Sequence, residues 1–158
     1  MKPEKSLRTR AMEILSRREI SRAELKRKLA PHADSEEEIE KVLPEFAERQ
    51  WQSDARYAEA YVHSKSRQHG ALRLKQALLA KGVADELIQP LLPERDAALH
   101  TAVALLRKKF KQPAADLAGR QKQMRFLAYR GFDMETIHAA IKSGKFHGMI
   151  WATTPKGS

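Results

Sequence analysis

Apolar residues recur along this chain at a constant step of 49 residues. The step joins Leu29, Leu78 and Leu127. Four further sets keep it: Ile39, Ile88 and Ile137; Leu43, Leu92 and Ile141; Met12, Tyr61 and Phe110; and Glu37, Glu86 and Glu135. Such a step predicts three copies of one structural unit. Repeat chains typically offer a long surface to an extended partner, and not a single pocket to a small substrate.

Within each unit the apolar spacing is that of amphipathic helices. In residues 7–15, the predicted buried stripe consists of Leu7, Ala11, Met12, Ile14 and Leu15. Ser21–Glu24 and Ser35–Glu38 are capping boxes, in which the serine and glutamate side chains satisfy the first free N–H groups of a new helix. Pro44 interrupts the apolar stripe that follows the second box. This predicts either a kink or a break and restart at that residue.

The second and third units show comparable helix signals. In the second unit, a helix capped by Ser53–Asp54 breaks at Gly70, the next helix ends at Lys81–Gly82, and a third spans residues 85–92. In the third unit, helices are predicted over residues 97–110, after Gly119, and over residues 134–141, where Asp133 is the cap. Residues 143–158 contain glycines and a proline, and they are predicted to form a loose tail.

No stretch shows the alternation of apolar and polar residues that is typical of a strand. The sequence therefore predicts an all-α fold of three tandem three-helix repeats that form an elongated, curved helical array. The predicted boundaries are residues 1–53, 54–104 and 105–147 for the three repeats and 148–158 for a flexible tail.

Composition narrows the class of protein. Apolar residues make up 42% of the 158 residues, which is enough for a core but leaves little to spare. The absence of cysteine excludes disulfides and thiolate metal sites. No signal peptide and no run of membrane-spanning length is present. We therefore expect a cytoplasmic protein with no membrane association, and a monomer.

Charge points to the kind of partner. The net charge is +10, and residues 1–30, 31–60, 61–110 and 111–158 carry +6, −6, +5 and +5 respectively. A basic balance of this size favours a polyanion or an acidic protein surface as partner. The acidic band falls in the first repeat, at residues 34–48, so the three repeats share a core pattern but not a surface.

Motifs for catalysis are missing. Six histidines are present, but none belongs to a metalloprotease motif, and scattered surface or half-buried imidazoles explain them better than a metal site. Glu36–Glu38 could bind a divalent cation, although a helix start explains the cluster more simply. There is no phosphate-binding glycine loop and no nucleophile motif. We expect no enzymatic activity, no catalytic residue, no cofactor and no metal.

Basic clusters occur in all three units, and they are the candidate partner-binding or DNA-binding residues. They are Arg17, Arg18, Arg22, Lys26 and Arg27; Arg67, Arg73 and Lys75; and Arg107, Lys108, Lys109, Arg120, Arg125 and Arg130. Each cluster by itself is best explained as the solvated face of a helix. Their recurrence with a net charge of +10 favours surfaces that contact phosphates or an acidic partner, with salt-dependent binding.

The aromatic residues leave alternatives open. Tyr57 and Tyr61 lie four residues apart and could stack on bases, but packing is favoured because Tyr61 shares its repeat position with Met12 and Phe110. Trp51 lies in the connector between the first two units. It could anchor a partner or seal the junction, and the sequence does not separate these two roles.

The middle of the chain resembles the RecX regulatory family. The resemblance rests on the stretch Ser-Asp-Ala-Arg-Tyr-Ala-Glu-Ala-Tyr-Val at residues 53–62, on residues 70–74 and 79–83, and on Arg130-Gly131-Phe132 followed by Ile137. The positions that match the family motif are Asp54, Arg56, Tyr57, Tyr61, Gly82, Gly131 and Phe132. The chain departs from the pattern at Trp51–Ser53, and at Ala33, which replaces the glycine found at Gly82 and Gly131.

The resemblance implies a bacterial modulator of the RecA recombinase. Such a protein binds RecA and its nucleoprotein filament, and it inhibits ATP hydrolysis, strand exchange and co-protease activity, thereby modulating recombination and the SOS response. It has no catalysis of its own. The alternative is a helical repeat protein that binds DNA directly and weakly, without RecA. The sequence leaves open which repeat contacts RecA and how many RecA subunits are spanned.

Overall fold

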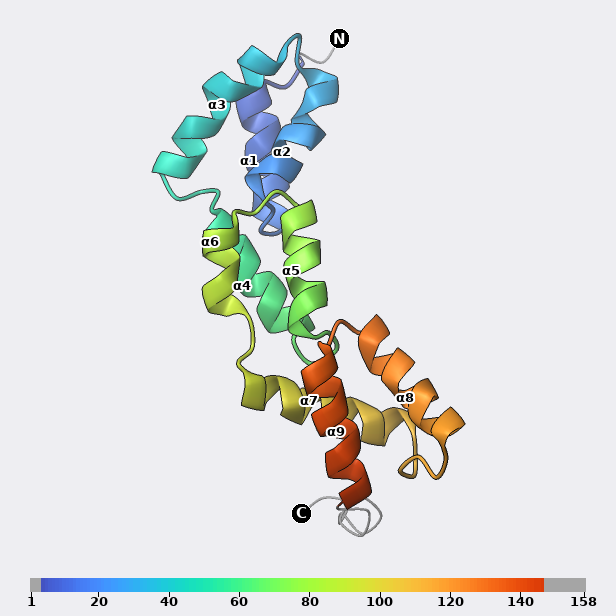
Figure 1. The fold of residues 1–158 in the computed structure, drawn as a ribbon. Helices are drawn as coiled ribbons and strands as arrows, with labels where there is room; N and C mark the ends of the chain where they lie inside the picture. The colour runs from blue at the N-terminus through green and yellow to red at the C-terminus, as the bar shows by residue number, and fades with distance from the viewer. Residues whose placement is uncertain (1–3, 147–158) are drawn as a thin grey trace. The chain divides into compact units, whose positions relative to one another are not determined.

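The computed structural model describes residues 4–146, and the side chains up to residue 143, as a chain of helices (Figure 1). The α-helices are α1 Leu7–Arg17, α2 Arg22–Leu29, α3 Glu36–Glu48, α4 Asp54–Lys65, α5 Ala71–Ala80, α6 Asp85–Ile88, α7 Arg95–Lys109, α8 Leu117–Tyr129 and α9 Met134–Phe146. Two 3₁₀ turns, η1 Ala30–His32 and η2 Gln89–Leu91, follow α2 and α6. No strand occurs in the described part of the chain, so the predicted all-helical repeat fold is confirmed.

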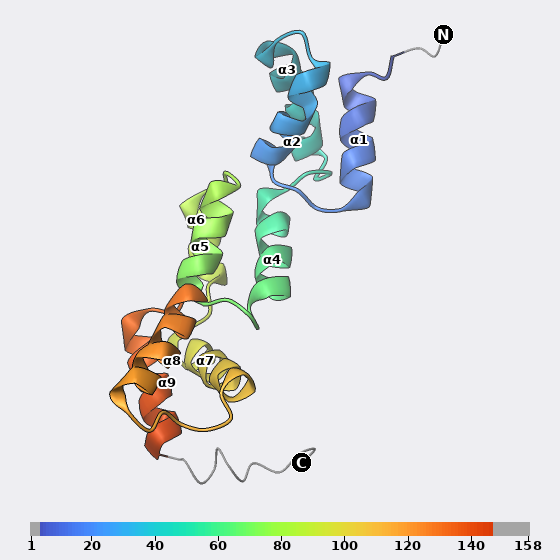
Figure 2. The same cartoon turned by 90° about the vertical axis from the view of Figure 1, so that its right-hand side faces the viewer.

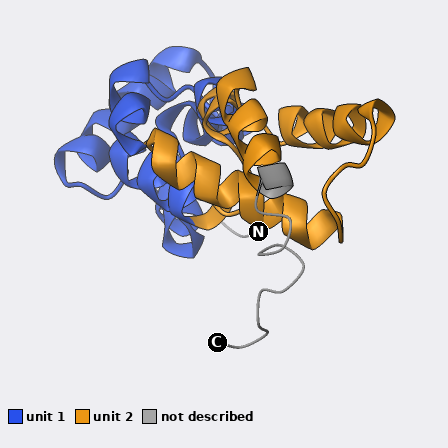
Figure 3. Ribbon diagram, turned by 60° about the horizontal axis from the view of Figure 1, so that its bottom comes forward, with its two compact units in different colours: residues 1–63, 77–91 blue, residues 64–76, 92–158 orange. Residues whose placement is uncertain are grey.

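The chain divides into two compact units (Figure 3). Unit 1 comprises Met1–His63 and Ala77–Leu91, and unit 2 comprises Ser64–Gln76 and Leu92–Ser158. The division passes through α4 and α5, so the two units do not coincide with the three predicted repeats. The boundary proposed between residues 104 and 105 falls inside α7.

The core of unit 1 lies where α1, α2 and α3 meet (Figure 2). Leu25 and Leu29, four residues apart on α2, are fully buried, because that spacing places both side chains on one face. The rest of this core consists of Leu7, Ala11, Ile20, Ile39, Leu43 and Phe46. Met12 was predicted to belong to the buried stripe of α1, and this was wrong, because 42% of its surface is exposed. Ile14 and Leu15 pack against the core as partly buried residues.

Unit 2 has its own core, in which α9 packs along α7 and α8. Its buried residues are Ala102, Leu106, Leu127, Phe132, Ile137, Ala140 and Ile141. Two sets related by the 49-residue step are buried throughout, namely Leu29, Leu78 and Leu127, and Ile39, Ile88 and Ile137. The 49-residue step therefore marks the packing positions of the second and third helices of each repeat.

Two predicted helix boundaries were wrong, and of the two alternatives at Pro44 the break does not occur. Pro44 causes no break, since α3 runs through it. Pro44 is exposed, while the buried side chains of Leu43 and Phe46 hold α3 to the core. Helix α8 begins at Leu117, before Gly119 and not after it, because the Asp116 carboxylate accepts from the Gly119 N–H at 2.7 Å. Helix α9 extends to Phe146 and takes up the start of the predicted loose tail. The predicted tail at residues 148–158 lies outside the described residues.

Three helix ends have a residue in the left-handed conformation. Gly82 (φ +81°) and Gly131 (φ +94°) end α5 and α8 as predicted for Lys81–Gly82, and their neighbours close the turn by donating back to Leu78 and Leu127. The third is Gln50 (φ +60°) after α3, which the sequence did not indicate. Ala33, which replaces the glycine in the first repeat, has an ordinary φ of −108°, because the turn η1 ends that helix instead.

Candidate functional site

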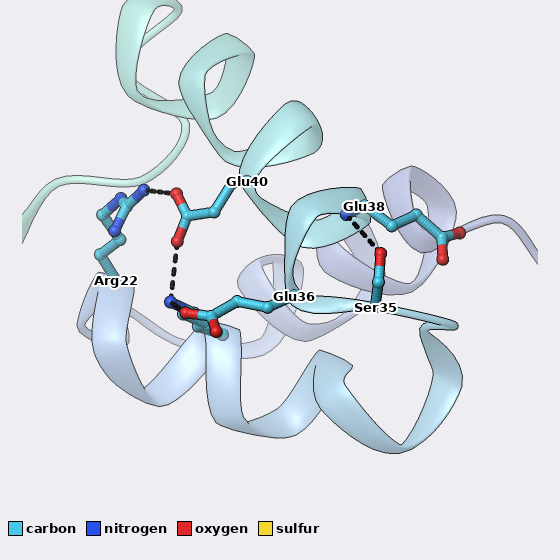
Figure 4. Close-up of polar contacts among 6 residues, drawn as sticks. Arg22, Ser35, Glu36, Glu38 and Glu40 are labelled. Atoms are coloured by element: carbon cyan, nitrogen blue, oxygen red, sulfur yellow. Dashed lines mark hydrogen bonds and ion pairs between the residues drawn. The ribbon is translucent and has the colours of Figure 1, made fainter.

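The basic residues of α2 in unit 1 are neutralised by the acidic helix α3 (Figure 4). The Ser35 hydroxyl accepts from the Glu38 N–H at 3.3 Å and starts α3, so that Glu36 and Glu40, one turn apart, both face α2. Glu40 binds Arg22 and also Lys26, the latter at 2.8 Å, and Lys26 contacts Glu36 too. The predicted acidic band therefore folds against the basic cluster of its own repeat.

The protonation of this network follows from these contacts. The hydrogen bonds that Lys26 donates to Glu36 and then to Glu40 raise the pKa of Lys26, and the hydrogen bonds that Glu40 accepts from Lys26 and then from Arg22 lower the pKa of Glu40. Both groups are thus held in their charged forms at neutral pH. Opposite charges in contact leave little net field for a distant polyanion.

Further ion pairs of unit 1 use glutamates of its first two helices and of their connector. Glu24 lies 3.6 Å from both Arg18 and Lys81, and Glu19 binds the guanidinium of Arg56 at 2.8 Å. Among the predicted basic residues of this unit, Arg18, Arg22 and Lys26 are therefore in ion pairs. Arg17 and Arg27 are exposed and have no ion pair within residues 4–143.

Unit 2 arranges two arginines differently, and we call Arg73, Arg130 and Tyr129 the Arg73–Arg130 cluster. Arg73 Nη1 donates to the Tyr129 carbonyl at 3.2 Å, and its guanidinium lies 5.0 Å from the centre of the Tyr129 ring. Arg130 Nη1 donates to the Gln68 carbonyl at 3.4 Å, and its guanidinium lies 5.4 Å from the Phe126 ring. Neither arginine has an ion pair in the described part of the chain, so both keep their full charge. Tyr129 is 75% exposed.

Two glycines bring this cluster together. The Gly70 N–H donates to the Arg130 carbonyl at 2.7 Å, and the Leu72 N–H donates to the Gly131 carbonyl at 3.0 Å. A Cβ at Gly70 would lie 2.5 Å from the Gly131 oxygen, and a Cβ at Gly131 would lie 2.2 Å from Arg73 Cβ. Only glycine at both positions permits this approach of the start of α5 to the end of α8. The approach places Arg73 beside Tyr129.

His69 lies among these cations. It is half-buried, its Nδ1 has no hydrogen-bond partner in the described residues, and its pKa is lowered by burial and then by Arg73, Arg130 and Lys65. Four basic groups therefore gather around the Gly70–Gly131 contact. Such a cluster, next to an exposed aromatic ring, attracts phosphates or carboxylates and offers a face for stacking.

The remaining predicted basic residues of unit 2 are more dispersed. Lys108 and Lys109 are exposed in the last turn of α7, where cations stabilise the negative end of the helix dipole. Arg107 and Lys75 are half-buried and interact with other groups. Arg67, Arg120 and Arg125 are exposed, and no ion pair involves them among the described residues.

Of the fourteen candidates, Arg22 and Lys26 are joined through Glu40, whereas Arg73 and Arg130 are brought together without a carboxylate. The sequence did not point to Tyr129, His69 or Lys65, which belong to the same cluster. Tyr129 directly precedes Arg130 and His69 directly precedes Gly70, so proximity to the two glycines was the signal that could have found them.

The family-motif residues of α4 serve the packing of unit 1. The Asp54 carboxylate accepts from the Arg22 N–H at 2.8 Å and from Gln52 Nε2 at 3.0 Å, so it ties α4 to the start of α2. Tyr57 is 8% exposed, and burial raises the pKa of its hydroxyl. Tyr61 is half-buried with its ring 6.3 Å from that of Tyr57. These tyrosines are placed for packing and not for stacking on bases.

The described part of the chain was searched for metal-binding clusters and for membrane-spanning helices. No group of three or more histidine, aspartate or glutamate side chains within it could hold a metal ion. Among the same residues, none of the helices combines the length and the apolar character that a membrane crossing requires.

Comparison with known proteins identifies the family. Residues 53–92 match the model of the second three-helix domain of RecX, and residues 96–141 match that of its third three-helix domain. The regulatory protein RecX of Neisseria meningitidis serogroup A is 67% identical over 142 residues, covering 90% of this chain and 93% of that protein. The chain belongs to the RecX family.

More distant members agree. The RecX regulatory protein of Chromobacterium violaceum is 44% identical over 140 residues, covering 89% of this chain and 91% of that protein. The crystal structure of RecX from Lactobacillus salivarius superposes with a TM-score of 0.78, covering 89% of this chain and 95% of that one. At 21% sequence identity the superposition establishes a shared fold. The resemblance stated from the residues is thereby confirmed.

Proposed function

We propose that this protein binds RecA and its nucleoprotein filament and inhibits its ATPase, strand-exchange and co-protease activities, thereby modulating recombination and the SOS response. The observation that carries this proposal is membership of the RecX family, at 67% identity over 90% of the chain. In this proposal the protein acts in the cytoplasm as a monomer, without catalysis of its own.

The charge distribution supports such a role. A RecA filament contains DNA, so a partner with a net charge of +10 is attracted to it over long range. This attraction speeds association and orients the partner more than it supplies affinity. The Arg73–Arg130 cluster is the best-defined contact candidate because its guanidinium groups are held by backbone carbonyls and are not neutralised by carboxylates.

A RecA assay decides this proposal. DNA-dependent ATP hydrolysis by RecA is measured with increasing amounts of this protein, and inhibition is expected at stoichiometric or lower ratios. Reversing the charge of the cluster with Arg73→Glu and Arg130→Glu should raise the concentration needed for half inhibition at least tenfold. The matched control is Arg120→Glu with Arg125→Glu, which changes the net charge equally on an exposed part of α8.

Two outcomes would contradict parts of the proposal. If an excess of wild-type protein over RecA leaves the ATPase rate unchanged, the proposed inhibition of RecA is excluded. Equal loss of inhibition in both double variants removes the special role of the cluster and leaves a general charge effect. Circular dichroism of each variant checks that the helices are retained.

The second candidate function is direct binding to DNA without RecA. It is favoured by the exposed Tyr129 ring beside the Arg73 guanidinium, since an aromatic face with a nearby cation suits single strands. Binding to a labelled single-stranded oligonucleotide should then weaken steeply with salt. No binding at low salt would exclude this function.

A further inference from the structure

Unit 1 has an apolar groove that the family assignment leaves unused. It has a volume of 340 Å³ and is lined by Met12, Leu15, Ser16, Phe46 and Trp51. Its floor is Phe46, which is buried in the core, and its opening is formed by Met12 and Trp51, which are 42% and 36% exposed. A groove of this size accepts one or two large side chains of a ligand.

The local backbone fixes Trp51 in place. After Gln50 takes the left-handed conformation, the Trp51 N–H donates to the Phe46 carbonyl at 2.8 Å. This turn brings the Trp51 ring edge-on to the Phe46 ring, with 5.4 Å between their centres. The indole is therefore held rigidly, and a rigid aromatic wall costs a ligand little ordering entropy.

Two arginines lie over the Trp51 ring, and one of them, Arg49, gives the opening a positive charge. The guanidinium groups of Arg8 and Arg49 lie 5.6 Å and 5.1 Å from the centre of the Trp51 ring. Arg8 is paired with Glu45 at 2.6 Å. It also donates to the Met12 sulfur at 3.7 Å, and this contact orients the Met12 side chain. Arg49 is exposed and has no ion pair in the described part of the chain. The nearby Glu13 is paired with Lys5 at 2.9 Å.

The third repeat indicates which side chain suits the groove. Phe110, which lies at the same repeat position as Met12, is covered by the ring of Phe126, with 5.6 Å between centres. The position equivalent to Phe126 in the first repeat is Lys28, which is exposed. Met12 therefore has no aromatic residue from the second helix of its repeat beside it, and it borders the groove with Phe46 and Trp51. A thioether adapts well to an aromatic ring that comes from outside.

We propose that this groove binds a short acidic segment of a partner protein through one aromatic side chain, which enters between Met12, Leu15 and Trp51 while a flanking carboxylate contacts Arg49. The occupant is a peptide and not a nucleic acid. The open side is lined by aliphatic and thioether groups, and Phe46 and two guanidinium groups already surround the indole. This inference concerns a separate surface from the Arg73–Arg130 cluster, and it does not rest on the RecA proposal.

Trp51 itself supplies the signal for the test. The chain has two tryptophans, Trp51 and Trp151, so in a Trp151→Phe background only Trp51 fluoresces. The probes are three acetylated heptapeptides: one with a central phenylalanine flanked by three glutamates on each side, one with alanine in its place, and one with the phenylalanine flanked by lysines. A single-stranded oligothymidylate is the fourth probe.

The acidic phenylalanine peptide should change the Trp51 emission saturably, and the alanine peptide should bind at least tenfold more weakly, about 1.4 kcal/mol. The lysine peptide should give no saturation. Met12→Asp and Arg49→Glu should each weaken binding at least tenfold. Met134→Asp is the matched control, because Met134 is a similarly exposed methionine (52%) in unit 2, and it should leave binding unchanged.

Several results would overturn this proposal. These are the lack of a saturable change with the acidic phenylalanine peptide, an equal response to the alanine peptide, or competition by the oligothymidylate for the same site. Analytical ultracentrifugation tests a second copy of the chain as the occupant. A wild-type dimer that Met12→Asp converts to monomer would assign the groove to self-association instead. Because RecA is absent from all arms, failure here leaves the RecA proposal untouched.

Discussion

Two groups of cations, one in each unit of this chain, are held in opposite ways. In unit 1, Arg22 and Lys26 are bound by the carboxylates of α3, and Arg56 by Glu19. In unit 2, Arg73 and Arg130 are bound by backbone carbonyls and lie over aromatic rings. A carboxylate cancels the charge that it orients, whereas a carbonyl orients the side chain and leaves the charge in place. The same residue type is thus structural in the first of these groups and available to a partner in the second.

The helix ends at Gly82 and Gly131 also differ: side chains secure the first, and main-chain hydrogen bonds secure the second. Both use a left-handed glycine at the end of the second helix of a repeat, Gly82 in unit 1 and Gly131 in unit 2. Gly82 faces only the methyl group of Ala23 at close range, and its surroundings are secured by side chains such as Asp54. Gly131 faces the backbone of Arg73 and is secured by main-chain hydrogen bonds from Gly70 and Leu72.

The largest expected effect comes from placing a methyl group at these glycines. Gly131→Ala should destabilise the protein by about 3 kcal/mol or more, from left-handed strain of about 1–2 kcal/mol and overpacking of about 1–3 kcal/mol. Gly82→Ala should cost about 2 kcal/mol, because the only close atom is the Ala23 Cβ at 2.5 Å. Urea denaturation measures both values.

A second substitution separates the two junctions. In an Ala23→Gly background, Gly82→Ala should lose part of its cost, because the methyl group that it meets is gone. In an Arg73→Gly background, Gly131→Ala should keep most of its cost, because the Arg73 backbone nitrogen lies 2.6 Å from the new Cβ. Double-mutant cycles give these coupling energies. A full recovery at Gly131 would contradict the backbone contact described above.

The charge difference between the units can be removed by freeing Arg22 and Lys26. Glu36→Gln with Glu40→Gln should increase affinity for single-stranded DNA several-fold and steepen the slope of log K against log salt by about 1.4, the value for two additional cations. Fluorescence anisotropy at several salt concentrations measures this. The control Glu48→Gln with Glu59→Gln changes net charge equally at exposed glutamates outside the network. Equal gains in both variants would show that overall charge, and not release of these cations, controls binding.

A substitution at the left-handed residue after α3 should change the stability by a smaller amount. Gln50 has a positive φ that glycine adopts freely, so Gln50→Gly should stabilise the protein by about 0.5–1 kcal/mol, as seen in thermal or urea unfolding. Ala33→Gly is the control, because Ala33 has φ −108° and gains nothing from glycine. A Gln50→Gly variant that is no more stable than the wild type would contradict the strain assigned to this turn.

The smallest expected effect is on how the folding stability depends on pH, which is set by His69 in unit 2 and by Glu40 in unit 1. Burial and the neighbouring cations lower the pKa of His69 below its usual 6.5, so the unfolded state binds the proton more readily. The contribution of neutral His69 to the free energy of unfolding is fully present above pH 6.5. It declines as the pH falls from 6.5 toward the lowered pKa. Glu40 also has a lowered pKa, so its contribution is present above its usual 4.5 and is lost only in more acidic solution.

Denaturation curves between pH 7.5 and pH 5 test the histidine. The difference in stability between wild type and His69→Gln should shrink as the pH falls through this range, whereas Glu40→Gln should produce no such trend until the pH falls below 4.5. A constant difference between wild type and His69→Gln would contradict the unfavourable surroundings described for the imidazolium.

Local signals predicted much of the fold. The capping residues Ser21, Ser35 and Asp133 all accept the expected backbone N–H groups, and Gly82 and Gly131 take the expected conformation. Such signals act over three or four residues, so they can be recognised in sequence. The break offered as one alternative at Pro44 does not occur, and no local signal indicated the conformation of Gln50, because tertiary packing of Leu43, Phe46 and Trp51 outweighs local preferences.

The candidate site was predictable only in part. Basic clusters are visible in sequence, but neutralisation by Glu40 depends on α3 facing α2, and the position of Arg73 beside Tyr129 depends on the contact of Gly70 with Gly131. Net charge therefore indicated a class of partner without showing which cations are available to it.

By itself, the sequence determined the helical repeat, its buried positions and the family, because these depend on spacing along one chain and on a conserved run of residue types shared with known relatives. The tertiary structure alone decided which arginines keep their charge, which helix ends are strained, and that Met12 borders an open groove instead of the core. The physical reason is that burial, ion pairing and backbone contact between distant segments are pairwise properties, and a linear pattern does not specify the second member of each pair.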